Sequence, residues 1–181
     1  MFVHVRDLEV RAARFDVEVA PGAIDYLDAE LRQAGPLKAA GKVELVTGSL
    51  GEIRATGHLM VPMESACDRC LEAARFPIDS DFVLYYRPVS EGYGDEKEID
   101  AGEAEMGFYE GDGLELNDVL REQVLLALPM QRVCRDDCKG ICPECGRNRN
   151  QNQCQCQTAA LDDRWAALQQ LKIGGRRGVR E

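Results

Sequence analysis

The amino-acid sequence predicts an α+β protein: a twisted, mostly antiparallel sheet, open or closed toward a barrel, with one packing helix and a cysteine-rich lobe. Three observations predict this class. Short apolar and β-branched runs alternate with turn residues, one later segment has helical periodicity, and six of the eight cysteines fall within twenty-three residues. A chain of 181 residues suits one domain with a small appendage. We expect an acidic body at 1–130, the cysteine-rich lobe at 131–158, and a helix with a basic tail at 159–181.

Predicted strands dominate the first half of the chain. The clearest alternation places Phe15, Val17 and Val19 on one face of an extended run. Turn-forming residues at 47–51 indicate a hairpin between two further runs. Strands are therefore expected at 2–8, 14–20, 42–48, 52–62, about 63–67 and 72–87.

A short helix is predicted after the second of these strands. Ile24, Leu27 and Leu31 recur at spacings of three and four residues, which is the pattern of one apolar helix face. Gly35-Pro36 would stop such a helix.

The strongest helical pattern lies at 118–128. Asn117 is placed to cap its first turn, and Pro129 follows its last turn. Its apolar face is wide, so we expect this helix to pack against the sheet. A final helix is expected at about 162–172, with a core-packing stripe of Trp165, Leu168 and Leu171.

Charge is unevenly distributed along the chain. Residues 1–130 carry 12 Lys and Arg against 26 Asp and Glu, whereas residues 131–181 carry 10 against 6. An acidic body with a basic end argues against wrapping of nucleic acid by the whole molecule, and it allows a local contact. Residues 91–118 carry 11 acids and one lysine. We expect a solvated loop there, with a contact for a basic partner as the alternative.

The clustered cysteines indicate bound zinc. Cys142-Pro-Glu-Cys145 followed by Gly146 has the composition of a zinc knuckle, and Cys154 with Cys156 supplies a second pair. Disulfides are the main alternative. However, the chain opens without a basic-then-apolar leader, and no apolar run approaches the ~20 residues that span a bilayer. We therefore expect a reducing, cytoplasmic location and one or two structural zinc ions.

The eight thiols can be divided in more than one way. One partition places Cys142, Cys145, Cys154 and Cys156 around a local ion, and Cys67, Cys70, Cys134 and Cys138 around an ion that joins distant segments. A crossed arrangement with Cys138 in the local site also fits the spacing, as does a single site with four spare cysteines. Because predicted strands flank the first pair, a hairpin knuckle is favoured over a thioredoxin-like motif.

The sequence carries no recognisable catalytic apparatus. A closed four-thiolate zinc site has no open position at which to activate water. The two histidines, His4 and His58, lie in strand-like runs with no acid at metal or triad spacing. No phosphate loop or nucleophile motif stands out. The sequence therefore predicts a non-enzymatic protein without a small-molecule substrate.

One series of motifs runs in a fixed order through the second half of the chain. It comprises Cys67-Asp-Arg-Cys70, Leu-Leu-Ala-Leu-Pro129, Cys134 with Cys138-Lys-Gly-Ile-Cys142-Pro-Glu-Cys-Gly146, Cys154-Gln-Cys156 and Asp163-Arg-Trp-Ala-Ala-Leu168. This order resembles the bacterial YceD family over about residues 60–172. Family members often carry Asn-Leu-Asn where this chain has Asn148-Arg149-Asn150, a change that makes the knuckle more basic and leaves the expected ligands intact.

The resemblance implies a non-catalytic factor that supports accumulation or processing of large-subunit ribosomal RNA and ribosome biogenesis. Its partner would be ribosomal RNA or a large-subunit ribosomal protein, with no membrane. A zinc-stabilised basic lobe could contact RNA phosphates through Arg132, Arg135, Lys139, Arg147 and Arg149. Two alternatives stay open: an adaptor that binds a basic ribosomal protein through the acidic body, and a thiol-based redox-sensing zinc protein.

Overall fold

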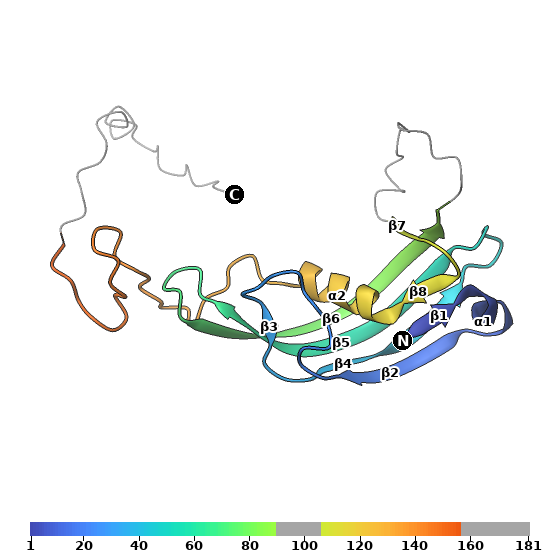
Figure 1. Cartoon of the computed structure of the whole chain (residues 1–181), viewed down its shortest axis with the longest axis horizontal. Helices are drawn as coiled ribbons and strands as arrows, with labels where there is room; N and C mark the ends of the chain where they lie inside the picture. The colour runs from blue at the N-terminus through green and yellow to red at the C-terminus, as the bar shows by residue number, and fades with distance from the viewer. Residues whose placement is uncertain (90–105, 157–181) are drawn as a thin grey trace, which may run out of the picture.

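A computed structural model describes residues 1–89 and 106–156 of the chain. Figure 1 shows a long, twisted sheet with a helix lying across one face and a loop-rich lobe extending from one end. The predicted helix at 162–172, with Trp165, and the basic tail lie outside the described residues, as does most of the acidic stretch. In chain order the elements are β1 (Phe2–His4), α1 (Val5–Val10), β2 (Ala13–Val19), β3 (Arg32–Gln33), β4 (Leu37–Leu45), β5 (Ile53–Ala66), β6 (Ala73–Pro88), β7 (Met106–Tyr109), β8 (Gly113–Glu115) and α2 (Leu116–Leu126).

The main sheet is open and mostly antiparallel. Its strand order is β2-β4-β5-β6-β7, with short β3 pairing beside β5, and only the β6–β7 pair is parallel. Strands β1 and β8 form a separate two-stranded sheet. No pairing joins β2 to β7 in the described part of the chain, so the barrel-like alternative is wrong. The α+β class itself, with its antiparallel sheet and packing helix, is confirmed.

A long hairpin carries the first cysteine pair. Strands β5 and β6 pair without interruption from Ile53 opposite Tyr86 to Ala66 opposite Ala73. The runs predicted separately at 52–62 and 63–67 are therefore one continuous strand. Cys67 and Cys70 lie in the turn beyond the last pair, where the Cys67 N–H donates to the Glu72 carbonyl at 2.7 Å. The predicted position of this pair at a hairpin tip is confirmed.

One face of the sheet forms the core, as strand alternation requires. The buried apolar residues of β5 are odd-numbered and those of β6 are even-numbered. Gly41 and Gly57 lie opposite each other on neighbouring strands. The Phe15 ring lies against both, and the Phe82 ring lies against Gly57. A Cβ on Gly57 would come within 2.8 Å of the Phe82 ring, so these glycines allow the rings to fill the centre of the core.

Two N-terminal predictions are wrong in detail. The strand expected at 2–8 ends at His4, and α1 follows it. The helix expected from Ile24 to Leu31 does not form, although both residues are buried. Asp25 and Asp28 explain the difference: each side chain accepts a hydrogen bond from the backbone N–H two residues later, at 2.9 Å. Such turns compete with helical hydrogen bonds.

The predicted core helix is confirmed with a shifted start. Helix α2 begins at Leu116 with Glu115 in the cap position, and Asn117 forms no side-chain cap. Its buried residues pack on the sheet core: Leu116, Val119, Leu120 and Val124. The loop expected through 118 is wrong for its second half, because β7, β8 and the start of α2 occupy it. None of the helices described is both long and apolar enough to span a bilayer.

Candidate metal centre

The eight cysteines gather into two groups of four. Within each group the four Sγ atoms all lie within 4.8 Å of one another. The inner cluster consists of Cys67, Cys70, Cys134 and Cys138, and the outer cluster consists of Cys142, Cys145, Cys154 and Cys156. This is the first of the partitions that the sequence allows, and the crossed arrangement is not seen.

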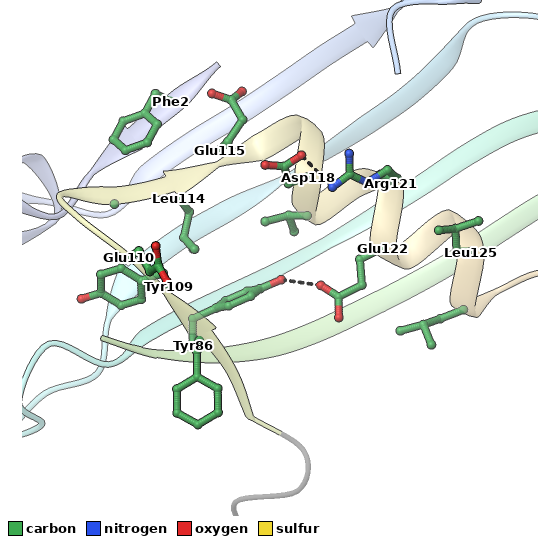
Figure 2. Close-up of a pocket in the computed structure, with 14 residues that line it drawn as sticks. Phe2, Tyr86, Tyr109, Glu110, Leu114, Glu115, Asp118, Arg121, Glu122 and Leu125 are labelled. Atoms are coloured by element: carbon green, nitrogen blue, oxygen red, sulfur yellow. Dashed lines mark hydrogen bonds and ion pairs between the residues drawn. The ribbon is translucent and has the colours of Figure 1, made fainter. Parts of the chain in front are cut away.

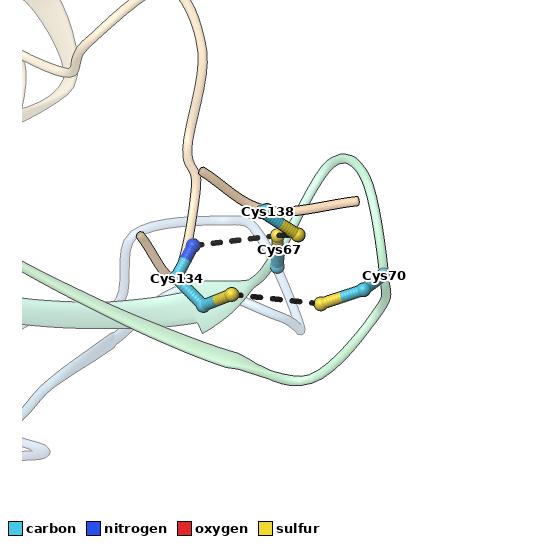
Figure 3. Close-up of side chains that lie close together, drawn as sticks. All are labelled: Cys67, Cys70, Cys134 and Cys138. Atoms are coloured by element: carbon cyan, nitrogen blue, oxygen red, sulfur yellow. Dashed lines mark hydrogen bonds between the residues drawn. The ribbon is translucent and has the colours of Figure 1, made fainter. Parts of the chain in front are cut away.

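Sulfur spacing in the inner cluster fits a tetrahedral metal site. The Sγ atoms of Cys67 and Cys138 are 3.9 Å apart, and those of Cys70 and Cys134 are 3.6 Å apart (Figure 3). Four sulfurs at about 2.3 Å from a central ion would be separated by about 3.8 Å. A disulfide bond needs about 2.05 Å. The inner cluster is therefore spaced for an ion and too wide for disulfides.

Both Cys-x-x-Cys turns have the same backbone conformation. Leu71 donates its N–H to the Cys67 carbonyl at 2.9 Å, and Gly146 donates to the Cys142 carbonyl at 2.8 Å. Each acceptor cysteine is the first of its pair, and each donor follows the second. Both donors have positive φ, 63° for Leu71 and 69° for Gly146. The outer turn uses glycine, for which this conformation costs little, whereas the inner turn holds a leucine in it.

Polar contacts dock the second inner pair against the hairpin tip. Asp68 and Arg132 are joined by two hydrogen bonds. The Asp68 N–H donates to the Arg132 carbonyl at 2.8 Å, and the Arg132 N–H donates to the Asp68 carboxylate at 2.6 Å. The Arg69 guanidinium donates to the carbonyls of Asp136 and Cys138, both at 3.3 Å, and to the Gln131 side chain at 3.0 Å. The residues between the two cysteines of the hairpin therefore hold the segment that brings Cys134 and Cys138.

Backbone amides favour the thiolate form of one inner cysteine. Burial alone would raise the pKa of Cys67, but the N–H groups of Arg69, Cys134 and Cys70 aim at its sulfur and lower the pKa to about 6. The Cys134 N–H is 3.3 Å from that sulfur. Burial raises the pKa of Cys134 to about 12, and the neighbouring thiols add to this. Four thiolates cannot share this space unless a cation balances them, which is the condition that a bound metal ion meets.

The outer cluster is built within 140–156 and is more exposed. An isolated bridge pairs Ile141 with Asn148, and the Cys142 N–H donates to the Arg147 carbonyl at 2.8 Å. The N–H groups of Cys145 and Glu144 lower the pKa of Cys142 to about 6. Hydrogen bonding with Cys145 raises the pKa of Cys156 to about 12. Cys142 is buried, but Cys145 and Cys156 are exposed.

Asn150 links the outer loop to the inner cluster, a role that no sequence pattern directly indicates. Its side-chain oxygen accepts the Lys139 N–H at 2.8 Å, and its Nδ2 donates to the Cys138 sulfur at 3.3 Å. Gly140 completes the junction with a φ of 71°, where a Cβ would lie 2.9 Å from the Arg69 carbonyl. An asparagine five residues after the second cysteine of the knuckle is the available hint, and spacing alone does not show which sulfur it reaches.

The five basic residues expected at a nucleic-acid surface differ in their availability. Arg132 is half-buried and pairs with Asp28 at 3.4 Å and Asp68 at 3.9 Å. Arg135 pairs with Asp137 at 3.3 Å. The side chains of Lys139, Arg147 and Arg149 are exposed, and no acid pairs with them in the described parts of the chain.

His58 has acidic neighbours that its sequence position does not show. Its Nδ1 lies 2.9 Å from Asp81 and its Nε2 lies 3.4 Å from Asp79, both on β6. His4 stacks edge-on against Phe2, with ring centroids 4.7 Å apart. His58 and these two aspartates are not among the groups of potential metal ligands that the described residues bring together.

Comparison with known proteins identifies the lineage. The family described as "Large ribosomal RNA subunit accumulation protein YceD" matches residues 55–172, which include the β5–β6 hairpin, α2 and both cysteine clusters. The chain belongs to the YceD family. No solved structure matches it.

Two relatives show how far the similarity runs along the chain. YlbN of Bacillus subtilis strain 168 is 22% identical over 163 residues, covering 87% of this chain and 86% of YlbN. Rv2926c of Mycobacterium tuberculosis H37Rv is 27% identical over 119 residues, covering 66% of this chain and 55% of Rv2926c. Both are described as uncharacterised, so the functional statement comes from the family name alone.

Proposed function

We propose that this protein is a non-catalytic factor that supports accumulation of large-subunit ribosomal RNA in the cytoplasm, and that zinc holds its RNA-contacting tip. Membership of the YceD family carries the first part of the proposal. The two groups of four cysteines support the second part.

Zinc is the metal that suits these donors best. Thiolates are soft ligands, and four of them in a tetrahedron form the usual structural zinc site. Amide N–H groups directed at Cys67 and Cys142 spread the negative charge of such a site. Each ion would have four protein ligands and no open position, so its role would be structural.

The ion count is directly measurable. Native mass spectrometry of protein purified in reductant should find two zinc ions per chain and no disulfide, one for each cluster. Hydrogen exchange should show protected amides at Ile141 and Cys142, which donate to the Arg69 and Arg147 carbonyls. Metal-free protein that retains this protection would contradict the zinc assignment.

RNA contact is proposed for three cations on the outer part of the lobe. Lys139, Arg147 and Arg149 are exposed around the outer cluster, whereas Arg132 already pairs with acids of the body. A zinc ion with four thiolates carries two negative charges overall. The tip is therefore not strongly positive as a whole, and contact with phosphates depends on where these three side chains point.

Salt-dependent binding tests this contact. A fragment of large-subunit rRNA should lose about tenfold or more in affinity when Arg147→Glu and Arg149→Glu are combined, and the dependence on salt should become shallower. Arg11→Glu combined with Arg14→Glu, both at exposed positions of the body, makes the same change of charge and should have little effect. Equal losses from both changes would mean that only overall charge matters. An unchanged affinity would remove these arginines from the interface.

The exposure of the outer cluster supports redox sensing as a second candidate. Cys145 and Cys156 are exposed, whereas Cys67 and Cys70 are buried. Peroxide would take two electrons from a pair of outer thiolates, forming a disulfide and releasing zinc while the peroxide is reduced to water. Zinc release should come first from the outer cluster and should change RNA affinity. Outer-ion release without any change in RNA affinity would exclude this role.

A further inference from the structure

A groove is lined by residues of β1, β6, β7, β8 and α2, and none of its lining residues comes from the cysteine lobe. Figure 1 shows where these elements lie relative to that lobe. The groove has a volume of about 680 Å³ and lies between α2, β7 and the small β1–β8 sheet. This volume is within the range of pockets that hold small ligands or several side chains of a bound peptide. None of the cysteines and none of the basic residues discussed above lines it.

The groove has an apolar floor with exposed apolar edges. Tyr86, Leu114 and Val119 are buried beneath it, and α2 anchors it to the core (Figure 2). At the edges, Phe2 is 44% exposed and Leu126 is 70% exposed. Large apolar side chains gathered around a concavity indicate an interaction surface, unlike single exposed apolar residues.

The groove also carries a strong excess of negative charge. Four acids line it against one base: Glu110, Glu115, Asp118 and Glu122 against Arg121. Arg121 pairs with Asp118 at 3.0 Å, and Glu122 accepts a hydrogen bond from the Tyr86 hydroxyl at 3.2 Å. Glu115 pairs with the N-terminal amino group. Glu110 is exposed and has no partner in the described residues.

The segment of sequence between β6 and β7 is also acidic. Residues 90–105 join β6 to β7, and both strands supply side chains to the groove. That segment contains seven acids and one lysine. An RNA ligand would be repelled here, whereas a cationic chain would be attracted.

We propose that this groove binds a basic segment of a partner protein that carries apolar side chains between its lysines or arginines. The apolar residues would enter the groove between Phe2 and Leu126, and the cations would lie over Glu110 and its neighbouring acids. The argument for this occupant is charge complementarity combined with an apolar floor. It goes beyond the proposed RNA contact and does not depend on bound metal.

Binding of two short labelled peptides to the full chain tests the proposal. A peptide of alternating lysine and leucine should bind, and one of alternating lysine and serine should bind about tenfold more weakly, because it lacks the apolar anchors. Fluorescence anisotropy at several salt concentrations measures both. Equal affinities would overturn the apolar part of the proposal.

Matched variants locate the site. Leu126→Asp and Glu110→Lys should each weaken the lysine–leucine peptide by about tenfold. Met130→Asp provides an exposed apolar control that does not line the groove, and Asp16→Lys on β2 provides a charge control. Controls that weaken binding as much as the groove variants would overturn the site.

An RNA oligonucleotide separates this surface from the RNA contact of the lobe. The groove variants should leave RNA affinity unchanged, and the lobe variant carrying Arg147→Glu and Arg149→Glu should leave peptide affinity unchanged. Each proposal can therefore fail without the other. RNA binding that is lost in Leu126→Asp, with peptide binding retained, would mean that the groove takes nucleic acid.

Discussion

Each of the two cysteine clusters presents four thiols, but the two clusters join very different lengths of chain. The inner cluster brings together residues 64 and 71 positions apart, and three of its four cysteines are buried. The outer cluster takes all its cysteines from 142–156, and two of the four are exposed. One cluster therefore connects two parts of the fold, and the other organises a single loop.

This difference assigns a different task to each proposed ion. The β5–β6 hairpin presents Cys67 and Cys70 at the end of a continuous ladder of backbone pairs. The inner ion then has to fix only the returning segment against a preformed tip. By contrast, the outer loop has one isolated bridge and a few turn hydrogen bonds, so the proposed ion would supply most of its folding free energy.

Removal of one cysteine from each cluster in turn should give the largest difference in stability between the two clusters. Cys138→Ser disables an ion that closes a long loop, a cross-link of about 4 kcal/mol in the chain-entropy treatment of disulfides, so the thermal midpoint should fall by about 10 °C. Cys156→Ser should affect the midpoint of the body far less, because its loop is short and local. Both variants should lose one zinc ion by mass spectrometry. Equal falls in midpoint would show that the clusters form one cooperative unit.

A buried carboxylate on β5 provides a test of stability in the body, away from the thiols. Glu64 on β5 lies between Arg32 on β3 and Arg75 on β6, and hydrogen bonds from Arg32 and then Arg75 hold its pKa below the ordinary 4.5. A lowered folded-state pKa means that its stabilisation is fully present above about pH 4.5 and is lost as the pH falls through the lowered value.

Glu64→Gln should therefore lower the thermal midpoint at pH 7, with a gap from the parent protein that narrows below pH 4.5. Glu44→Gln is the matched control, because Glu44 also pairs with two bases but is more exposed. Its effect should be smaller. Unfolding of all three proteins at each pH makes any loss of metal at low pH common to the comparison. A gap that stays constant down to pH 3 would rule out the ion pairs as its cause.

Local sequence patterns predict the strands and the helix around the cysteines more accurately than the contacts between the cysteines. The hairpin around Cys67 and the core helix were predictable because alternation and helical periodicity are local signals. The absent helix at 24–31 shows the limit, since two aspartates formed turns that an apolar pattern does not reveal. The partition of the thiols stayed open, because it depends on how residues more than sixty positions apart come together.

Asn150 supplies two of the hydrogen bonds at the junction between the clusters. Asn150→Ala removes hydrogen bonds to the Lys139 N–H and the Cys138 sulfur, and it should cost about 1–2 kcal/mol locally. Faster hydrogen exchange at Lys139 measures this loss. Asn152→Ala, at an exposed neighbouring position, is the control. If exchange at Lys139 is unaffected, the two clusters are not coupled through this side chain.

The smallest expected effects come from the two turns with the same conformation. Leu71 holds a positive φ that costs an ordinary residue about 1 kcal/mol, so Leu71→Gly should relieve strain but also raise the entropy of the unfolded chain. We expect a net change within about 0.5 kcal/mol of zero. Gly146→Ala adds the strain without a clash, since no atom lies within 4 Å of the added Cβ, and should cost about 1 kcal/mol.

The location of these small effects is more informative than their size. Leu71 lies in the hairpin tip, so its change should appear in the global unfolding midpoint. Gly146 lies in the outer loop, so its change should appear as faster local exchange at Cys142 and weaker binding of one zinc ion. If Gly146→Ala instead lowers the global midpoint, the outer loop must already be folded as part of the body before its ion binds. The inner cluster would then no longer differ from the outer cluster in connecting two parts of the fold rather than organising a single loop.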